Sequence, residues 1–92
     1  MRPFNVDAAW RLHPQAVIRP ERFGALLYHF GTRRLSFLKS PTLLAVVQAL
    51  DDAPTARAAC QRAGVRPDEL DRYRRALSAL AASQMIRERT ES

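Results

Sequence analysis

The sequence predicts an α+β fold in which three antiparallel strands precede three helices. Two runs of alternating apolar and polar residues flank Gly31 and Thr32, a pair typical of the tight turn in a β-hairpin. After Lys39 the apolar residues recur at spacings of three and four, as they do along one face of a helix. Single prolines and glycines then follow at positions that suit helix starts and ends. These three observations place all the strands before all the helices.

The three strands are expected within residues 16–19, 25–30 and 33–38. The first is β-branched and is stopped by Pro20, and the second opens after Gly24. Alternation alone does not decide which side of the third strand meets the helices. Residues 1–14 precede the strands, and we expect them to form an irregular arm that includes a possible short edge strand around Trp10.

The helices are expected at residues 41–50, 53–63 and 67–82. Serine and proline at positions 40 and 41 start the first, because serine caps free amides and proline suits the first helical position. Gly64 suits a left-handed cap after the second, so the last two helices resemble a helix-turn-helix. The domain should therefore span residues 15–86, with a polar tail over 87–92.

The charge balance favours an acidic partner. The 92 residues carry a formal net charge of +6, and Lys39 is the only lysine among the 15 cations. Arginine binds carboxylates and phosphates with a bidentate fork, so the partner is either a nucleic acid or an acidic peptide. The alternative is that the arginines form an ordinary solvated surface. The apolar run at residues 43–47 is too short to span a membrane, and the N-terminus lacks a secretion signal, so we expect a cytoplasmic protein.

No constellation of residues predicts catalysis or a metal site. The single cysteine, Cys60, is expected to be a small core residue, since no motif places a histidine base beside it. His13 and His29 lack the spacing of metal ligands. The acidic pairs at residues 51–52 and 68–69 lie at expected helix ends, where capping explains them better than acid–base chemistry. We expect a binding protein without a cofactor.

One long stretch of the chain resembles a known family. Residues 18–41, with the sequence IRPERFGALLYHFGTRRLSFLKSP, are similar to the mycofactocin precursor-peptide chaperone family, often called MftB. The resemblance covers residues 10–86 and is weaker after residue 41. That family is related to the pyrroloquinoline quinone peptide chaperone, and both are recognition elements for ribosomally made, modified peptides. The resemblance implies a winged-helix-like, non-catalytic domain whose partners are the mycofactocin precursor peptide and the radical S-adenosylmethionine maturase.

The resemblance also implies a binding site. In related recognition elements the leader segment of the peptide adds as a strand along the third strand, in the cleft beside the third helix. Edge strands expose unpaired backbone groups that can accept another chain. We expect an acidic leader, because arginines border this cleft. The residues implied on this chain are Arg33, Arg34, Leu35, Ser36, Phe37 and Leu38 of the strand and Arg72, Tyr73, Arg75, Ala76 and Ala79 of the helix.

Each of these residues also has a simpler interpretation. Leu35 and Phe37 are equally well explained as core residues, and Tyr73 shares a helical stripe with other apolar residues, which favours packing. The helix arginines are explained as solvated side chains. Arg33 and Arg34 are explained as charges that block edge-to-edge aggregation.

The alternative function is that of a winged-helix DNA-binding protein. The net positive charge and the helix-turn-helix pattern favour it. A recognition helix, however, presents its N-terminal residues to the bases, and here that end carries Asp68, Glu69 and Asp71. These carboxylates disfavour a nucleic acid partner, and the apolar run at residues 43–47 is too short for a membrane span, so we expect neither a nucleic acid nor a membrane among the partners.

Overall fold

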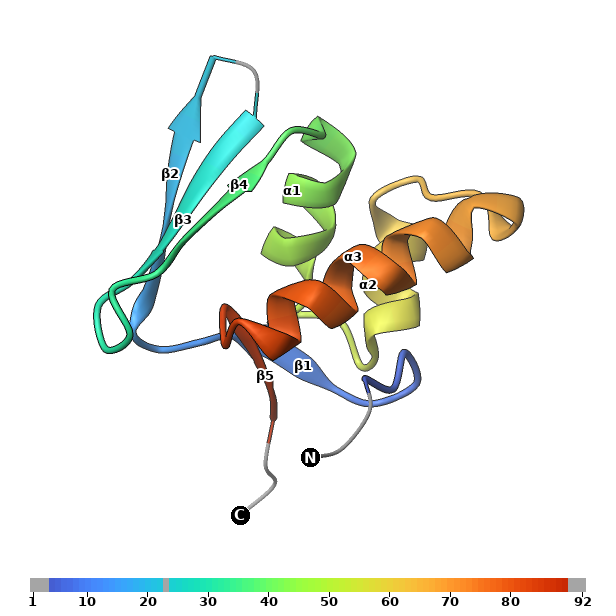
Figure 1. Cartoon of the computed structure of the whole chain (residues 1–92). Coiled ribbons are helices and arrows are strands. Elements are labelled where there is room, and N and C mark those ends of the chain that lie inside the picture. Colours follow the sequence, from blue (N-terminus) through green and yellow to red (C-terminus); the bar gives the residue numbers. More distant parts are fainter. Residues whose placement is uncertain (1–3, 23, 90–92) are drawn as a thin grey trace.

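The computed structural model describes residues 4–22 and 24–89 and confirms the α+β class (Figure 1). A three-stranded antiparallel sheet precedes three helices, as expected, and this arrangement is compatible with a winged-helix-like fold. The elements are β1 (Trp10–Leu12), β2 (Ala16–Glu21), β3 (Gly24–His29), β4 (Leu35–Leu38), α1 (Pro41–Ala49), α2 (Ala56–Arg62), the short 3-10 helix η1 (Pro67–Glu69), α3 (Leu70–Ala82) and β5 (Ile86–Glu88).

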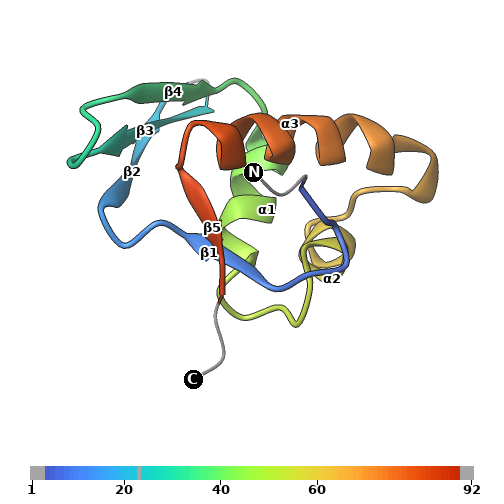
Figure 2. The same cartoon turned by 60° about the horizontal axis from the view of Figure 1, so that its bottom comes forward.

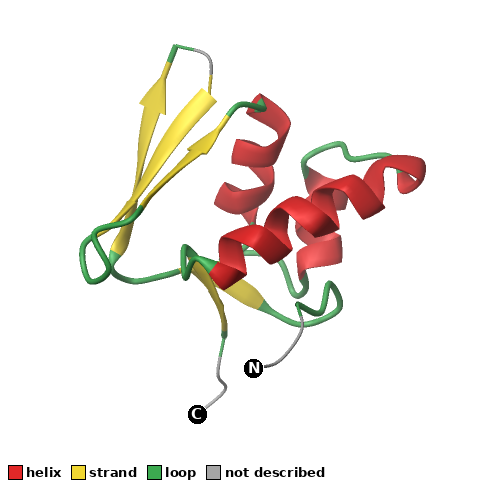
Figure 3. Cartoon of the chain, in the orientation of Figure 1, coloured by secondary structure: helices red, strands yellow, loops and turns green. Residues whose placement is uncertain are grey.

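The main sheet has the strand order β2-β3-β4, so β3 is central and the other two strands form its edges. Along β3 buried and half-buried residues alternate, and Ala25, Leu27 and His29 face the interior. Leu38 of β4 lies opposite Ala25 and is also buried, which decides the orientation that alternation left open. The sheet therefore has one face toward the helices and one face toward solvent. Figure 3 shows the strands of this sheet on one side of the molecule and the helices on the other.

The three helices begin and end close to the expected positions. The hydroxyl of Ser40 accepts a hydrogen bond from the backbone N–H of Leu43 and caps α1, which presents Val46 and Val47 to the core. Thr55 caps α2 in the same way, so this helix begins at Ala56, three residues later than expected. The third segment is divided into η1 and α3 instead of forming one continuous helix.

A second, two-stranded sheet joins the two ends of the described chain. β1 pairs antiparallel with β5, with Trp10 opposite Glu88 and Leu12 opposite Ile86 (Figure 2). The short strand around Trp10 is thus present, whereas Arg87 and Glu88, expected in a polar tail, belong to a strand. The side chain of Arg89 further donates hydrogen bonds to the backbone carbonyls of residues 51 and 53. Positions 1–3 and 90–92 of the expected arm and tail lie outside the described residues.

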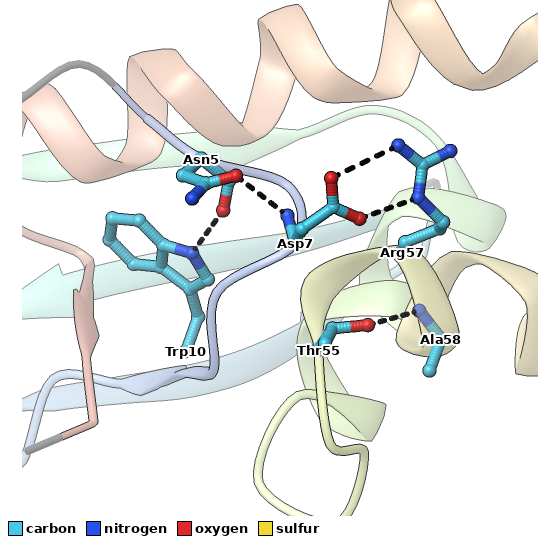
Figure 4. Close-up of polar contacts among 6 residues, drawn as sticks. All are labelled: Asn5, Asp7, Trp10, Thr55, Arg57 and Ala58. Carbon is cyan, nitrogen blue, oxygen red and sulfur yellow. Dashed lines mark hydrogen bonds and ion pairs between the residues drawn. The ribbon is translucent and has the colours of Figure 1, made fainter.

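The described part of the N-terminal arm is fastened to α2 (Figure 4). The backbone N–H groups of residues 56 and 57 donate to the carbonyls of residues 8 and 6, at 3.0 and 2.8 Å. The Arg57 guanidinium forms an ion pair of 2.7 Å with Asp7, and this hydrogen bond lowers the pKa of the Asp7 carboxyl. The indole N–H of Trp10 donates to the carbonyl of Asn5 at 2.8 Å. Residues 5–14 therefore pack as part of the domain.

Candidate functional site

The edge of the main sheet at β4 is open on the side away from β3. Among the described residues β4 pairs with β3 alone. The backbone N–H of His29 donates to the carbonyl of Arg34, so His29 occupies a hydrogen-bonded position of the antiparallel ladder opposite Arg34. Bonded and non-bonded pairs alternate from there, which makes Leu35 and Phe37 the non-bonded positions. The N–H and C=O groups of Leu35 and Phe37 therefore point outward and are available to another strand.

A hollow lies between the N-terminus of α1, which directly follows β4, and the first half of α3. It has a volume of about 370 Å³ and is lined by Ser40, Leu43, Arg72, Tyr73 and Ala76. Tyr73 is half-buried and packs against the core, so the packing role and a place in this hollow both hold for it. The hollow is large enough to receive one or two side chains of a bound chain.

The expected arginines occupy two different electrostatic environments. On α3, Arg72 pairs with Glu69 at 3.1 Å and also lies over the Tyr73 ring, 5.3 Å from its centroid. Arg75 pairs with Asp71 at 2.8 Å. Arg33 and Arg34 are exposed in the β3–β4 turn, and no ion pair of their side chains is found within the described ranges. The turn arginines are thus better placed than those of α3 to bind an incoming carboxylate.

The third strand of the main sheet begins at Leu35, which corrects the expected start at Arg33. Arg33 has a φ of 63°, in the left-handed region, and this conformation ends any strand geometry there. The imidazole of the buried His29 explains the turn, because its Nδ1 accepts hydrogen bonds from the N–H groups of Gly31 and Thr32 at 3.0 and 3.1 Å. The Nε2 atom of the same ring is buried and has no hydrogen-bond partner among the described residues.

The structure brings together some of the predicted site residues and separates others. Arg72, Tyr73 and Ala76 meet at the hollow. Leu35 and Phe37 are 60% and 49% exposed on the solvent face of the sheet, which excludes the interpretation that they are core residues and directs their side chains away from the helices. Of the other predicted residues of β4, Leu38 is buried and Ser36 is half-buried on the side of the sheet that faces the helices. On α3, Arg75 and Ala79 are exposed.

Sequence reasoning missed the contribution of α1 to this hollow. Ser40 and Leu43 line it, and the hydrogen bond between them caps the helix. The signal was present, because serine before proline marks the point where the edge strand passes into α1. A larger hollow, of about 540 Å³, lies between the second half of α3 and the β1–β5 sheet, where Trp10, Ser78 and Ile86 contribute to its lining. The smaller hollow is the one connected to the open β4 edge through the chain, because Ser40 in its lining follows the end of β4 at Leu38 by two residues.

Neither a reactive thiol nor a metal-holding cluster is found among the described residues. Burial raises the pKa of the Cys60 thiol, which is the opposite of what a nucleophile requires. No group of three or more histidines, cysteines or acidic residues is placed to hold a metal ion in the part of the chain that the structure describes. Within the same residues, the helices are all too short or too polar to cross a membrane.

Comparison with known proteins identifies the family. The family model for the Peptide chaperone MftB family matches residues 9–87. The chain belongs to this family. It is 61% identical to the peptide chaperone MftB of Mycobacterium tuberculosis and 54% identical to that of Mycolicibacterium smegmatis, each over 83 residues. These alignments cover 90% of this chain and 76% and 81% of the two relatives. No solved structure matches the chain.

Membership in the MftB family decides between the broad classes of function. The curated relatives, including that of Mycobacterium ulcerans at 59% identity, are named peptide chaperones, a non-catalytic role. The protein is accordingly a peptide chaperone and not an enzyme. The open β4 edge and the adjacent hollow are the features to which a peptide partner can be assigned.

Proposed function

We propose that the protein binds the leader segment of the mycofactocin precursor peptide as a strand added to β4, and that it presents the peptide to the radical S-adenosylmethionine maturase in the cytoplasm. The observation that carries the proposal is the open edge at Leu35 and Phe37, next to the hollow lined by Tyr73. Membership in a peptide chaperone family supports a peptide as the partner.

Backbone pairing alone is too weak to hold the leader. Leu35 and Phe37 together present two N–H and two C=O groups, and a hydrogen bond contributes about 0.5–1.5 kcal/mol net. Four such bonds give about 2–6 kcal/mol, while association itself costs at least about 4 kcal/mol. Side chains must therefore contribute. The hollow beside Tyr73 suits an apolar leader residue, and Arg33 and Arg34 suit acidic ones.

A titration of the fluorescently labelled precursor peptide tests the partner. We expect saturable binding to the wild-type protein and much weaker binding of a peptide with a scrambled leader. Replacing Arg34 and Arg75 together by glutamate should weaken binding, mainly through Arg34, because Arg75 is already paired with Asp71. Arg62→Glu on α2 is the matched control. Equal affinity for the authentic and scrambled leaders would refute the proposal.

The presentation step is tested with the maturase. A domain that binds both peptide and enzyme raises the effective concentration of the substrate at the active site. We expect the maturase to process the precursor peptide markedly faster with this protein than without it, and the difference to shrink when the peptide is in large excess. Equal turnover with and without the protein would refute the adaptor role.

Duplex DNA is the alternative ligand that the net charge of +6 favours. Asp68 and Asp71 are exposed where α3 begins, and carboxylates there would oppose phosphates. We therefore expect little binding to random duplex DNA at physiological salt. Affinity for DNA comparable to that for the precursor peptide would favour the alternative.

A further inference from the structure

The outer face of the main sheet is an apolar surface, and none of the helices in the described part of the chain covers it. Val17 of β2, Tyr28 of β3 and Leu35 of β4 lie side by side across the three strands, as the pairing register shows. The next row joins Leu26 and Phe37. Of the large apolar side chains here, Val17 is 42% exposed, Phe37 49% and Leu35 60%, and Phe30 after β3 is 57% exposed. Such contiguous exposure is unusual for a surface that faces only water.

Cations predominate at the two ends of the strands that form this face. Between residues 16 and 40 the chain carries five cations and one acidic residue, namely Arg19, Arg22, Arg33, Arg34 and Lys39 against Glu21. Arg19 lies on the outer face with its side chain 76% exposed, in a 3.5 Å ion pair with Glu21. A second copy of this chain would bring the same positive rim against itself, which disfavours a symmetric dimer. A surface with an apolar centre and an acidic rim complements it instead.

We propose that this outer face, defined by Val17, Arg19, Tyr28, Leu35 and Phe37, is the surface that docks the maturase, which should offer an apolar patch with an acidic rim. This inference rests on the proposed function for the identity of the partner. The backbone of Leu35 and Phe37 faces the open edge while their side chains lie on the outer face. One strand thus serves both ligands, the peptide through its main chain and the maturase through its side chains.

This arrangement makes the bound peptide part of the docking surface. A leader strand paired with β4 extends the sheet by one strand, and its residues opposite Leu35 and Phe37 present their side chains on the same outer face. The maturase would then contact the sheet and the leader together. We expect the maturase to bind the peptide-loaded form more tightly than the free form, and the peptide to gain affinity by the same factor.

Variants on β2 separate this surface from the peptide site. Val17 and Arg19 lie on the strand at the far edge of the sheet from β4. We expect Val17→Asp and Arg19→Glu each to weaken maturase binding, by about ten-fold for a residue near the centre of the interface, and to leave the affinity for the precursor peptide unchanged. Gln48→Asp, which adds a negative charge on the exposed side of α1, is the control. Arg19→Glu at an exposed side chain keeps the test valid should Val17→Asp reduce folding.

Four outcomes are distinguishable when binding of labelled maturase and of labelled peptide is measured for each variant. Loss of maturase binding alone, in both β2 variants and not in the control, supports the inference. Wild-type affinity for the maturase in both variants overturns it. Loss of peptide binding together with maturase binding, in folded protein, overturns it by assigning the face to the peptide. If the wild-type protein binds no maturase at all, the proposed function itself fails.

Discussion

Replacing Phe37 by proline removes one backbone donor from the open edge of β4. The register makes Phe37 a non-bonded position toward β3, so its N–H points away from the sheet. Proline is tolerated on edge strands where the missing N–H faces outward. Phe37→Ala is the matched control, because it removes the same side chain and keeps the donor. Ser36→Pro is the reverse control, because the N–H of Ser36 points toward β3 and its loss should unfold the hairpin.

The expected magnitude follows from the bond that is lost. One backbone hydrogen bond is worth about 0.5–1.5 kcal/mol, and leaving its partner carbonyl without a donor adds up to about as much again. Phe37→Pro should therefore bind the precursor peptide with an affinity about two- to 150-fold below that of Phe37→Ala, which corresponds to about 0.5–3 kcal/mol. The free energy of unfolding should differ much less between these two variants.

Isothermal titration calorimetry with the precursor peptide measures this difference, and urea unfolding verifies that both variants are folded. The comparison is between the proline and alanine variants, not with the wild type, because the Phe37 side chain has a proposed role of its own on the outer face. If both variants bind the peptide equally, no bond to the N–H of Phe37 forms, and strand addition at this position is refuted.

Three further predictions concern stability. Gly24→Ala should destabilise the fold by about 1–3 kcal/mol or more in urea unfolding. Gly24 has a φ of 153°, and an added Cβ would lie 1.8 Å from the carbonyl oxygen of Leu38. An unchanged urea midpoint would contradict this close packing of β3 against β4. Thr55→Ala should cost about 1 kcal/mol through loss of the α2 cap, whereas Thr55→Ser should cost little; equal losses would contradict the cap. Burial and the adjacent His29 lower the pKa of His13, so the unfolded state binds the proton more readily than the folded state. The free energy of unfolding should therefore fall as pH decreases through the ordinary histidine value of 6.5. His13→Gln should flatten this slope, and an identical pH dependence in that variant would disprove the link between His13 protonation and stability.

The local signals in the sequence predicted most of the main sheet and the helices. The serine cap at Ser40 and the left-handed Gly64, with a φ of 89°, mark element ends through interactions within a few residues. The β1–β5 sheet was only half foreseen, because each strand has three residues and the pairing joins segments more than 70 residues apart in sequence. Its partner strand β5 carries too little periodicity to be recognised alone.

The candidate site was predictable as a region but not in its detail. The start of β4 depends on the imidazole of His29 binding the turn amides, a side-chain interaction that no periodicity expresses. Which face of β4 is buried depends on the position of Leu38 over the core, and this decides that Leu35 and Phe37 face solvent. The ion pairs that occupy Arg72 and Arg75 likewise follow from helix geometry in the folded chain.

Amide hydrogen exchange of the protein with and without saturating precursor peptide tests the central claim most directly. If the leader adds as a strand to β4, the N–H groups of Leu35 and Phe37 should exchange much more slowly in the complex. The N–H groups of Ser36 and Leu38, which face β3, should already be protected in the free protein. Unchanged exchange at Leu35 and Phe37 in a saturated complex would show that the peptide binds elsewhere.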